Sequence, residues 1–223
     1  MPSDPTPMIR TFYLIRHGET VFNAESRIQG QSDAPLSERG RRQAEAVADA
    51  LADAPIDAIF SSPLRRALET ASCLAAKLSL PIRTDPRLME LNAGVFEGRL
   101  RSELEAESSP EFLQWLAGGD EFTIPGGESR RQLAQRGGDA LRALAAEGYR
   151  TTVVVTHGGW LSATLKSLLH LPQPLPPFSL GNGSITRLAV DPQGGFSLLS
   201  LNEVDHLRTM SKPNERYGPL HGE

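Results

Sequence analysis

Short apolar runs recur along the chain and predict the strands of a sheet. Residues 11–15 (TFYLI) and 56–60 (IDAIF) are mostly apolar runs of strand length. Residues 151–155 (TTVVV) are β-branched throughout, which favours a central strand. Further strands are expected at 81–84, 184–190 and 196–201. Because only a short turn joins the last two, one of them should run antiparallel to its neighbours.

Apolar residues at helical spacing fill the stretches between these strands. Residues 36–52 show this spacing, with Ser37 as the expected N-cap. The dipeptide Ser62-Pro63 should open a second helix, with the serine as cap and the proline in the first turn. A third helix is expected over 160–170. Strands and helices therefore alternate along most of the chain.

This alternation predicts one three-layer α/β/α domain with a mostly parallel central sheet. We expect the domain to span 11–210, after a disordered leader at 1–10 and before a flexible tail at 211–223. Residues 99–130 should form an inserted, lid-like segment within it. In sheets of this kind ligands bind beyond the carboxyl ends of the strands. The residues that follow each strand are therefore the candidate site.

Composition narrows the partners and the location. The 223 residues carry a formal net charge of −4, which disfavours general nucleic-acid binding. The N-terminus lacks the apolar stretch of a signal peptide, and no apolar run approaches the roughly 18 residues of a membrane helix. The single cysteine, Cys73, cannot close an internal disulfide. We therefore expect a cytoplasmic protein that binds no nucleic acid and no membrane.

Polar residues of one chemical kind follow three of the expected strands. They are Arg16-His17-Gly18, Ser62-Pro63-Leu64-Arg65-Arg66 and Thr156-His157-Gly158. Because parallel strands end at one edge of a sheet, two histidines and an arginine pair should meet there, beside free backbone N–H groups at helix starts. Such an edge suits a dianion. The glycine after each histidine allows a bound group to approach the backbone closely.

A histidine at this edge can act as the nucleophile in phosphoryl transfer. A neutral imidazole has a lone pair on one ring nitrogen, and a backbone carbonyl that holds the other N–H fixes the tautomer. Fixed arginines and a protonated second histidine can supply the positive charge that other enzymes take from a metal. The leaving oxygen needs a proton from a carboxylic acid, for which Glu90 is the best candidate. We therefore expect no metal and no cofactor.

Each of these pieces also has an ordinary structural explanation. An isolated Arg-His-Gly occurs often by chance, and His157 could be a hydrogen-bonded residue at a strand end. Arg65 and Arg66 could lie on the surface at a helix start, and Glu90 and Glu97 could be solvated. The functional interpretation is favoured because the histidines and arginines follow three expected strands rather than one.

Taken together, the motifs resemble those of the histidine phosphatase superfamily, also called the phosphoglycerate mutase-like family. The resemblance covers residues 11–205. The matching segments, in chain order, are Arg16-His17-Gly18-Glu19-Thr20 with Asn23, Gln29-Gly30 with Asp33 and Pro35-Leu36, Ser62-x-Leu64-x-Arg66-Ala67 with Glu69-Thr70, Glu90-x-x-x-Gly94-x-x-Glu97-Gly98, Pro125-Gly126-Gly127-Glu128-Ser129, and Thr156-His157-Gly158-Gly159.

The resemblance implies a two-step reaction. His17 would take the phosphoryl group and form a phosphohistidine, and Glu90 would protonate the leaving group and then help to activate water. Glu97 is the alternative acid, but its place in the family indicates a supporting role. The phosphate-binding arginine of the family directly precedes an Ala-x-x-Thr stretch, which assigns it to Arg66 rather than Arg65. The residues implied to hold the phosphoryl group are Arg16, Asn23, Gln29, Gly30, Arg66, His157 and Gly158.

The activity that the resemblance implies is hydrolysis of a small phosphorylated metabolite. Family mutases carry an Arg-His-Tyr-Gly stretch after the catalytic glutamate, where this chain has the uncharged Leu91-Asn92-Ala93-Gly94. That difference favours a phosphatase over a phosphoglycerate mutase. A non-catalytic phosphate-binding module is disfavoured because the nucleophile, the acid and the second histidine are all present. Phosphatases of protein phosphohistidine tend to be shorter. The sequence is compatible with a homodimer.

The inserted segment 99–130 is the part most open to two interpretations. Its large apolar residues are at near-helical spacing and more often form a packed core than a binding surface; they are Phe112, Trp115, Leu116 and Phe122. If they face the site instead, they favour a substrate with a carbon skeleton. The pairs Gly118-Gly119 and Gly126-Gly127 could then be the flexible ends of a lid.

Overall fold

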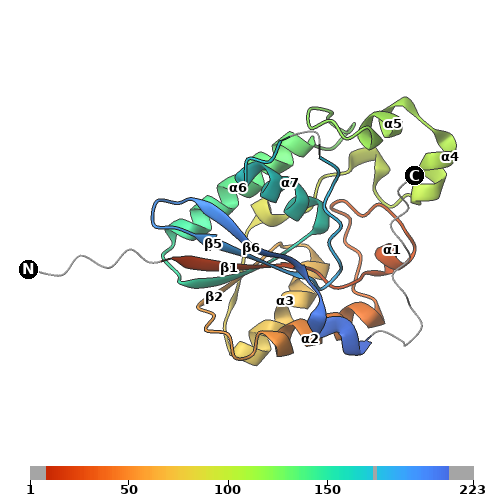
Figure 1. The fold of residues 1–223 in the computed structure, drawn as a ribbon. Helices are drawn as coiled ribbons and strands as arrows, with labels where there is room; N and C mark the ends of the chain where they lie inside the picture. Colours follow the sequence, from red (N-terminus) through yellow and green to blue (C-terminus); the bar gives the residue numbers. More distant parts are fainter. Residues whose placement is uncertain (1–8, 173–174, 211–223) are drawn as a thin grey trace, which may run out of the picture.

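A six-stranded sheet runs through the centre of the computed structural model, which describes residues 9–172 and 175–210 (Figure 1). The strands are β1 (Arg10–Arg16), β2 (Ala58–Ser61), β3 (Ile82–Thr84), β4 (Thr151–Thr156), β5 (Ile185–Val190) and β6 (Phe196–Glu203). They lie in the order β3-β2-β4-β1-β5-β6. The first four in this order are parallel, and β5 runs antiparallel to β1 and β6. The expected sheet, mostly parallel with an antiparallel closing strand, is confirmed.

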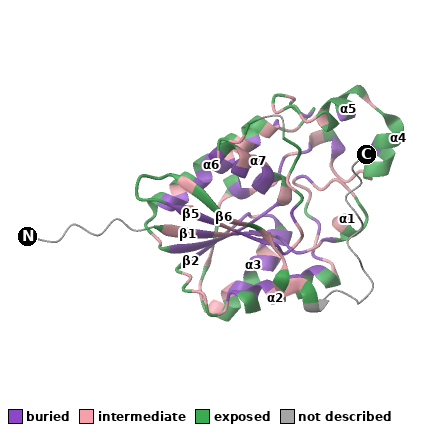
Figure 2. Cartoon of the chain, in the orientation of Figure 1, coloured by how far each residue is buried: buried purple, intermediate pink, exposed green. Residues whose placement is uncertain are grey.

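Two pairs of helices cover the two faces of this sheet (Figure 1). Helices α2 (Glu38–Ala50) and α3 (Arg65–Leu78) lie on one face, and α6 (Arg130–Ala146) and α7 (Gly158–Leu168) on the other. The middle strands are buried (Figure 2), and β4 is buried along its whole length. Its side chains alternate, with Val154 in the core under α6 and α7 and Val155 in the core under α2 and α3. The three-layer architecture is therefore confirmed.

Shorter helices occupy the connections. They are α1 (Val21–Ala24), α4 (Arg101–Glu107) and α5 (Pro110–Leu116), with the 3-10 turns η1 (Pro86–Leu88), η2 (Gly94–Phe96) and η3 (Asp205–Met210). Helices α4 and α5 belong to segment 99–130 and lie beyond the carboxyl ends of the strands (Figure 1). Phe112 of α5 is fully buried and meets Phe96 edge-on, with 5.6 Å between the ring centroids. Within the described ranges, no helix combines the length and apolar character needed to span a membrane.

The starts of the helices agree with the sequence at α2 but not at α3. Ser37 caps α2 through its side chain, as expected. The expectation that Ser62 and Pro63 open the next helix is wrong, because α3 begins at Arg65 without a side-chain cap. The hydroxyl of Ser62 instead lies 2.8 Å from Nε2 of His157. The same hydroxyl accepts from the N–H of Leu64 at 3.3 Å, so Ser62 stabilises the turn ahead of α3, and Leu64 takes the cap position.

The ends of the chain differ from expectation in one respect. Arg10 is the first residue of β1 and pairs with Val190 of β5, so a leader over 1–10 is one residue too long at least. Residues 1–8 and 211–223 lie outside the described residues. The remainder of the leader, and the flexible tail, therefore stay predictions.

Candidate active site

Two histidines meet because the central strands β1 and β4 are parallel and in register. Arg16 pairs with Thr156, and the ladder continues for one more residue, where the N–H of His17 donates to the Thr156 carbonyl at 3.0 Å. His17 and His157 therefore leave neighbouring strands at the same level, with 5.1 Å between their ring centroids. Both side chains are buried, at 2% and 0% relative exposure. The structure thus brings together the first and third of the expected strand ends.

His17 is held in the tautomer that a nucleophile requires. Its Nδ1 lies 2.7 Å from the carbonyl oxygen of Gly18, and because a carbonyl can only accept, the ring proton sits on Nδ1. Nε2 then keeps its lone pair. Burial lowers the pKa of His17 well below its ordinary value, and the charges of Arg66 and Arg16 lower it further. The lone pair is therefore available at physiological pH.

His157 is neutral as well, which corrects the expectation of a protonated second histidine. Its Nδ1 accepts a 3.2 Å hydrogen bond from Nε of Arg66, a group that can only donate. Nε2 therefore carries the ring proton and lies 2.8 Å from Oγ of Ser62. Burial, followed by the charge of Arg66, lowers the pKa of His157 well below its ordinary value. The positive charge of the free site comes from arginine alone.

Arg66, not its neighbour Arg65, enters the site. The Arg66 side chain is fully buried, and its two terminal nitrogens donate to the carbonyls of Ser32 at 2.8 Å and Gly30 at 2.7 Å. Gly30 therefore positions the guanidinium through its carbonyl oxygen. Arg65 is exposed and pairs with Glu69. In the described part of the chain Arg66 has no carboxylate partner, so its charge stays available to an anion.

Arg16, which is half-buried, brings a second guanidinium to the same place. One terminal nitrogen donates to the carbonyl of Leu180. Its Nε is buried and has no hydrogen-bond partner among residues 9–172 and 175–210. Gly158 lies against it, since a Cβ at that position would come within 3.2 Å of Nε. A buried cationic donor without an acceptor is unfavourable, so Nε of Arg16 is a natural contact for an anionic oxygen.

The carboxylate of Glu90 lies at the N-terminus of α7. Oε1 accepts hydrogen bonds from the N–H groups of Trp160 and Leu91, both at 2.8 Å, and Oε2 accepts from that of Gly159 at 2.9 Å. A Cβ on Gly159 would stand 2.6 Å from Oε1, which explains the glycine. Burial lowers the pKa of both site arginines, and the charge of Glu90 opposes that shift, as expected of a nearby carboxylate. The N–H groups of Gly159 and Trp160, in the first turn of α7, therefore bind Glu90 and do not stay free for phosphate, which had been expected.

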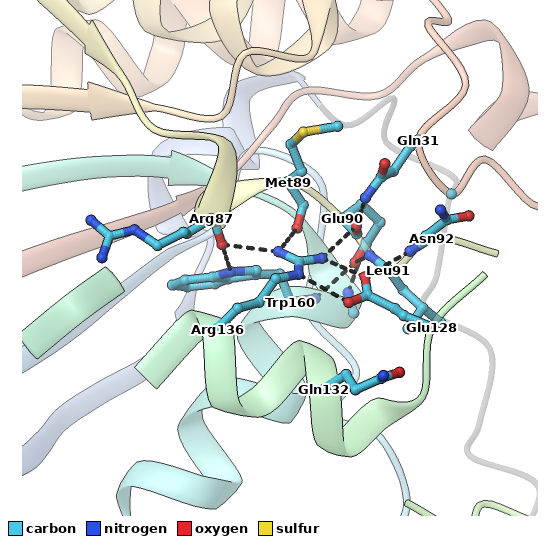
Figure 3. Close-up of polar contacts among 12 residues, drawn as sticks. Gln31, Arg87, Met89, Glu90, Leu91, Asn92, Glu128, Gln132, Arg136 and Trp160 are labelled. Carbon is cyan, nitrogen blue, oxygen red and sulfur yellow. Dashed lines mark hydrogen bonds and ion pairs between the residues drawn. The ribbon is translucent and has the colours of Figure 1, made fainter. Parts of the chain in front are cut away.

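Arg136 of α6 holds the backbone around Glu90 (Figure 3). Its guanidinium donates to the carbonyls of Arg87 at 2.9 Å, Met89 at 2.6 Å and Glu90 at 2.8 Å. It also makes two hydrogen bonds to the carboxylate of Glu128. The segment that carries Glu90 is thereby fixed to α6. Sequence analysis missed Arg136, because nothing in a polar helix position shows that its side chain reaches carbonyls 46 to 49 residues away.

Glu97 supports the loop that holds Arg66. Its Oε1 accepts from the N–H groups of Gln31 at 2.7 Å and Ala93 at 3.1 Å, and its Oε2 accepts from the hydroxyl of Ser32 at 3.0 Å. Two of these partners belong to the loop whose carbonyls orient the Arg66 guanidinium. These contacts agree with the supporting role that the resemblance implies for Glu97.

Asn23 and Gln29 hold the loop that follows His17. Oδ1 of Asn23 accepts from the Thr20 N–H at 3.1 Å, and Oε1 of Gln29 accepts from the Thr20 hydroxyl at 2.8 Å. Asn182 donates both to Asn23 Oδ1 at 3.2 Å and to the His17 carbonyl at 3.1 Å. Sequence analysis missed Asn182 because it precedes the antiparallel strand β5. Phosphate contacts from Asn23 and Gln29 stay predictions.

The family follows from a comparison with known proteins. Residues 12–204 match the model of the histidine phosphatase superfamily, branch 1. The chain belongs to the histidine phosphatase superfamily. It is 44% identical to a probable phosphoglycerate mutase, GpmB, of Yersinia pestis (strain Pestoides F) over 161 residues, which are 72% of this chain and 75% of that protein.

Solved structures share the fold of this superfamily member. A mycobacterial glucosyl-3-phosphoglycerate phosphatase matches with a TM-score of 0.78 at 34% identity, over 87% of this chain and 99% of that one. Phosphoserine phosphatase from Entamoeba histolytica, in complex with 3-phosphoglyceric acid, matches with a TM-score of 0.77 at 30% identity, over 89% and 99%. The family and the fold class expected from the sequence are both confirmed.

In this member of the superfamily the groups that phosphoryl transfer needs lie together in the site. A lone pair on His17, the buried guanidinium of Arg66, the half-buried guanidinium of Arg16 and the Glu90 carboxylate lie at one edge of the sheet. Among the described residues no three His, Cys, Asp or Glu side chains gather as metal ligands. The positive charges at this edge of the sheet are those of Arg16 and Arg66.

Proposed function

We propose that the chain hydrolyses phosphomonoesters through a phosphohistidine on His17. The observation that carries the proposal is a neutral, buried His17 with its lone pair on Nε2. It is set beside the buried Arg66 and the half-buried Arg16, neither of which forms a salt bridge in the described ranges. Electrostatic stabilisation by such fixed charges is a large term in phosphoryl transfer. A site that was only structural would not need two guanidinium groups that form no salt bridge within the described ranges.

The reaction has two steps. In the first, Nε2 of His17 attacks phosphorus, a P–N bond forms, and the bond to the ester oxygen breaks while Glu90 gives that oxygen a proton. Arg16 and Arg66 hold the non-bridging oxygens. In the second, Glu90 takes a proton from water, the water oxygen attacks phosphorus, and the P–N bond breaks. Inorganic phosphate leaves, and neutral His17 and protonated Glu90 are restored.

The relatives support a small phosphorylated metabolite as the substrate. The two phosphatases of similar structure are named for glucosyl-3-phosphoglycerate and for phosphoserine. No metal is needed for the steps above, because the positive charge comes from arginine. We therefore propose a metal-independent phosphoric monoester hydrolase.

A mutase is the second candidate, because the relative at 44% identity is named a probable phosphoglycerate mutase. A mutase has to keep the dephosphorylated acid bound while the phosphoryl group returns to another hydroxyl. Residues 91–94, which follow Glu90, carry no charge, and the N–H of Asn92 is already bound to Glu128 at 2.9 Å. This uncharged stretch offers no cation for the acid and supports hydrolysis.

Phosphorus NMR of the purified protein with 3-phosphoglycerate and EDTA separates the two candidates. A hydrolase releases inorganic phosphate, whereas a mutase forms the positional isomer without releasing phosphate. The same experiment on a panel of other phosphomonoesters covers substrates unlike 3-phosphoglycerate. Activity that EDTA abolishes and magnesium or zinc restores would contradict the metal-independent mechanism.

A further inference from the structure

A large groove begins beside two residues that adjoin Glu90 and runs along α7, although Glu90 itself does not line it. It has a volume of about 1080 Å³ and lies between α7, the start of α6, the end of α5 and residues 175–177. These helices lie on one side of the sheet (Figure 1). Leu91 and Gly159 line one end, and Gly159 is the residue whose N–H binds Oε2 of Glu90. The groove is therefore placed to receive the part of a substrate that leaves with the ester oxygen.

The walls of the groove combine apolar surface with four cations, two of which, Arg131 and Arg142, form salt bridges with Glu121 and Asp139. Trp115, Leu116 and Ala163 supply apolar surface, and Arg130 and Lys166 supply positive charge. Trp115, which the sequence favours as a core residue, does pack against Phe112 and Phe96, but it also lines this groove. The groove therefore has both apolar and charged walls.

Neither Arg130 nor Lys166 has a salt bridge in the described part of the chain. Nζ of Lys166 donates to the Leu175 carbonyl at 2.6 Å, and Arg130 donates to the Trp115 carbonyl at 3.0 Å. Burial lowers the pKa of each, and Asp120, which also lines the groove, is the carboxylate whose charge opposes that shift. With the salt-bridged Arg131 and Arg142 set aside, the two positive charges of Arg130 and Lys166 and the negative charge of Asp120 leave this cluster with a single positive charge. That balance matches a monoanion better than a second phosphoryl dianion.

The spacing along α7 sets the length of the ligand. Lys166 lies seven residues, or two helical turns, beyond Gly159 on the same face. At a rise of 1.5 Å per residue, this places its Cα about 10 Å along the helix axis. Extended chains advance roughly 3.5 Å for every three bonds, so about eight or nine bonds would join the ester oxygen to the group at Lys166.

We propose that this groove binds an elongated alcohol moiety that ends in a carboxylate, which pairs with Lys166 and Arg130. The inference rests on the proposed hydrolase function and deepens it by naming the substrate class. That class is a phosphomonoester of a long-chain hydroxy acid, rather than of a three-carbon acid. The apolar wall contacts the carbon skeleton, and the cations select its acidic end.

The first test needs no substitution. Phosphate monoesters of ω-hydroxy acids with chains of increasing length are compared with neutral alkyl phosphates of the same length, and kcat/KM is measured for each. We expect the acid to be preferred by about tenfold at lengths of eight to nine bonds and not at three. Equal kcat/KM for acids and neutral esters at every length overturns the inference. A preference for diphosphorylated chains over the acids does so too.

The second test assigns the preference to Lys166. Lys166→Met should remove the advantage of the long acids, mainly by raising KM, and leave the rate with p-nitrophenyl phosphate within about twofold. Lys166→Glu should transfer the preference to chains that end in an amine. Lys77→Met is the matched control, because Lys77 lies on α3 and pairs with Asp49. A preference for the long acids that survives in Lys166→Met contradicts the assignment.

The outcomes separate this inference from the proposed function. If the protein hydrolyses p-nitrophenyl phosphate but hydrolyses long acids and neutral esters equally well, the hydrolase function is supported and the carboxylate site in the groove is contradicted. Failure to hydrolyse every ester, p-nitrophenyl phosphate included, contradicts both. A thermal melt of each variant shows whether a loss of rate follows from unfolding.

Discussion

At the scale of single residues, burial decides the protonation of the site. The pKa values of His17 and His157 are both lowered by burial and then by the neighbouring arginines. Sequence reasoning anticipated a His17 tautomer held by a backbone carbonyl, and the Gly18 contact shows it. It also anticipated a charged His157, which the structure contradicts. The contact from Arg66 that keeps His157 neutral joins positions 91 residues apart and therefore leaves no local signal in the sequence.

These lowered pKa values predict how stability depends on pH. Below the ordinary histidine pKa, near 6.5, the unfolded chain binds protons at His17 and His157 while the folded chain does not. Stability is therefore present above about pH 6.5 and is lost as pH falls toward the folded pKa values. The free energy of unfolding, measured in urea at pH 7.5 and at pH 5.5, should fall between these pH values by about 1 kcal/mol less in His17→Asn than in the unsubstituted protein. His170→Asn, at an exposed position, is the matched control, and an unchanged loss in His17→Asn would contradict the prediction.

Glu90→Gln should slow alkyl phosphates far more than aryl phosphates. An acid matters most when the departing oxygen is basic, and general acid catalysis contributes about 10²–10⁴-fold. Glu97→Gln should lower both classes together and by less, since Glu97 contacts the loop that orients Arg66. Steady-state rates on a series of leaving groups measure the difference. Equal losses on both classes in Glu90→Gln would show that Glu90 only positions or packs.

At the scale of elements, the segment that carries Glu90 is held by α6, a helix that lies more than 40 residues later in the sequence. Arg136 and Glu128 join α6 to the carbonyls around Glu90 (Figure 3). The strands were predictable to within about two residues, because short runs of β-branched and apolar residues favour buried strands. The start of α3 could not be predicted in this way. Ser62 contacts His157 and the N–H of Leu64, and Leu64, not Ser62, is the residue before the helix.

Arg136→Gln should therefore impair proton transfer without removing phosphoryl binding. We expect turnover of alkyl phosphates to fall by about tenfold, a smaller loss with aryl phosphates, and unchanged inhibition by inorganic phosphate. Arg136→Lys should recover part of the loss, because lysine can still pair with Glu128. Arg142→Gln is the matched control on the same helix, where the arginine is exposed and faces Asp139. Identical losses with both leaving-group classes would indicate a purely structural brace.

At the scale of the whole molecule, the sheet converts distant motifs into one site. Four parallel strands in register bring residues 16–18, 62–66 and 156–158 to one edge, although the motifs span most of the chain. This part was predictable, because the carboxyl ends of parallel strands share an edge. The groove along α7 was not, because it depends on how α5, α6 and residues 175–177 pack together. A moving lid over 99–130 stays a prediction.

The central claim is that His17 becomes phosphorylated during turnover. A rapid acid-free quench with a phosphorus-labelled ester, followed by peptide mapping, tests it most directly. We predict a phosphoryl group on His17 that is labile in acid and stable in alkali, that forms before steady state, and that is absent from His17→Ala, which should not turn over. A label on His157, or near-normal turnover by His17→Ala, would contradict the account.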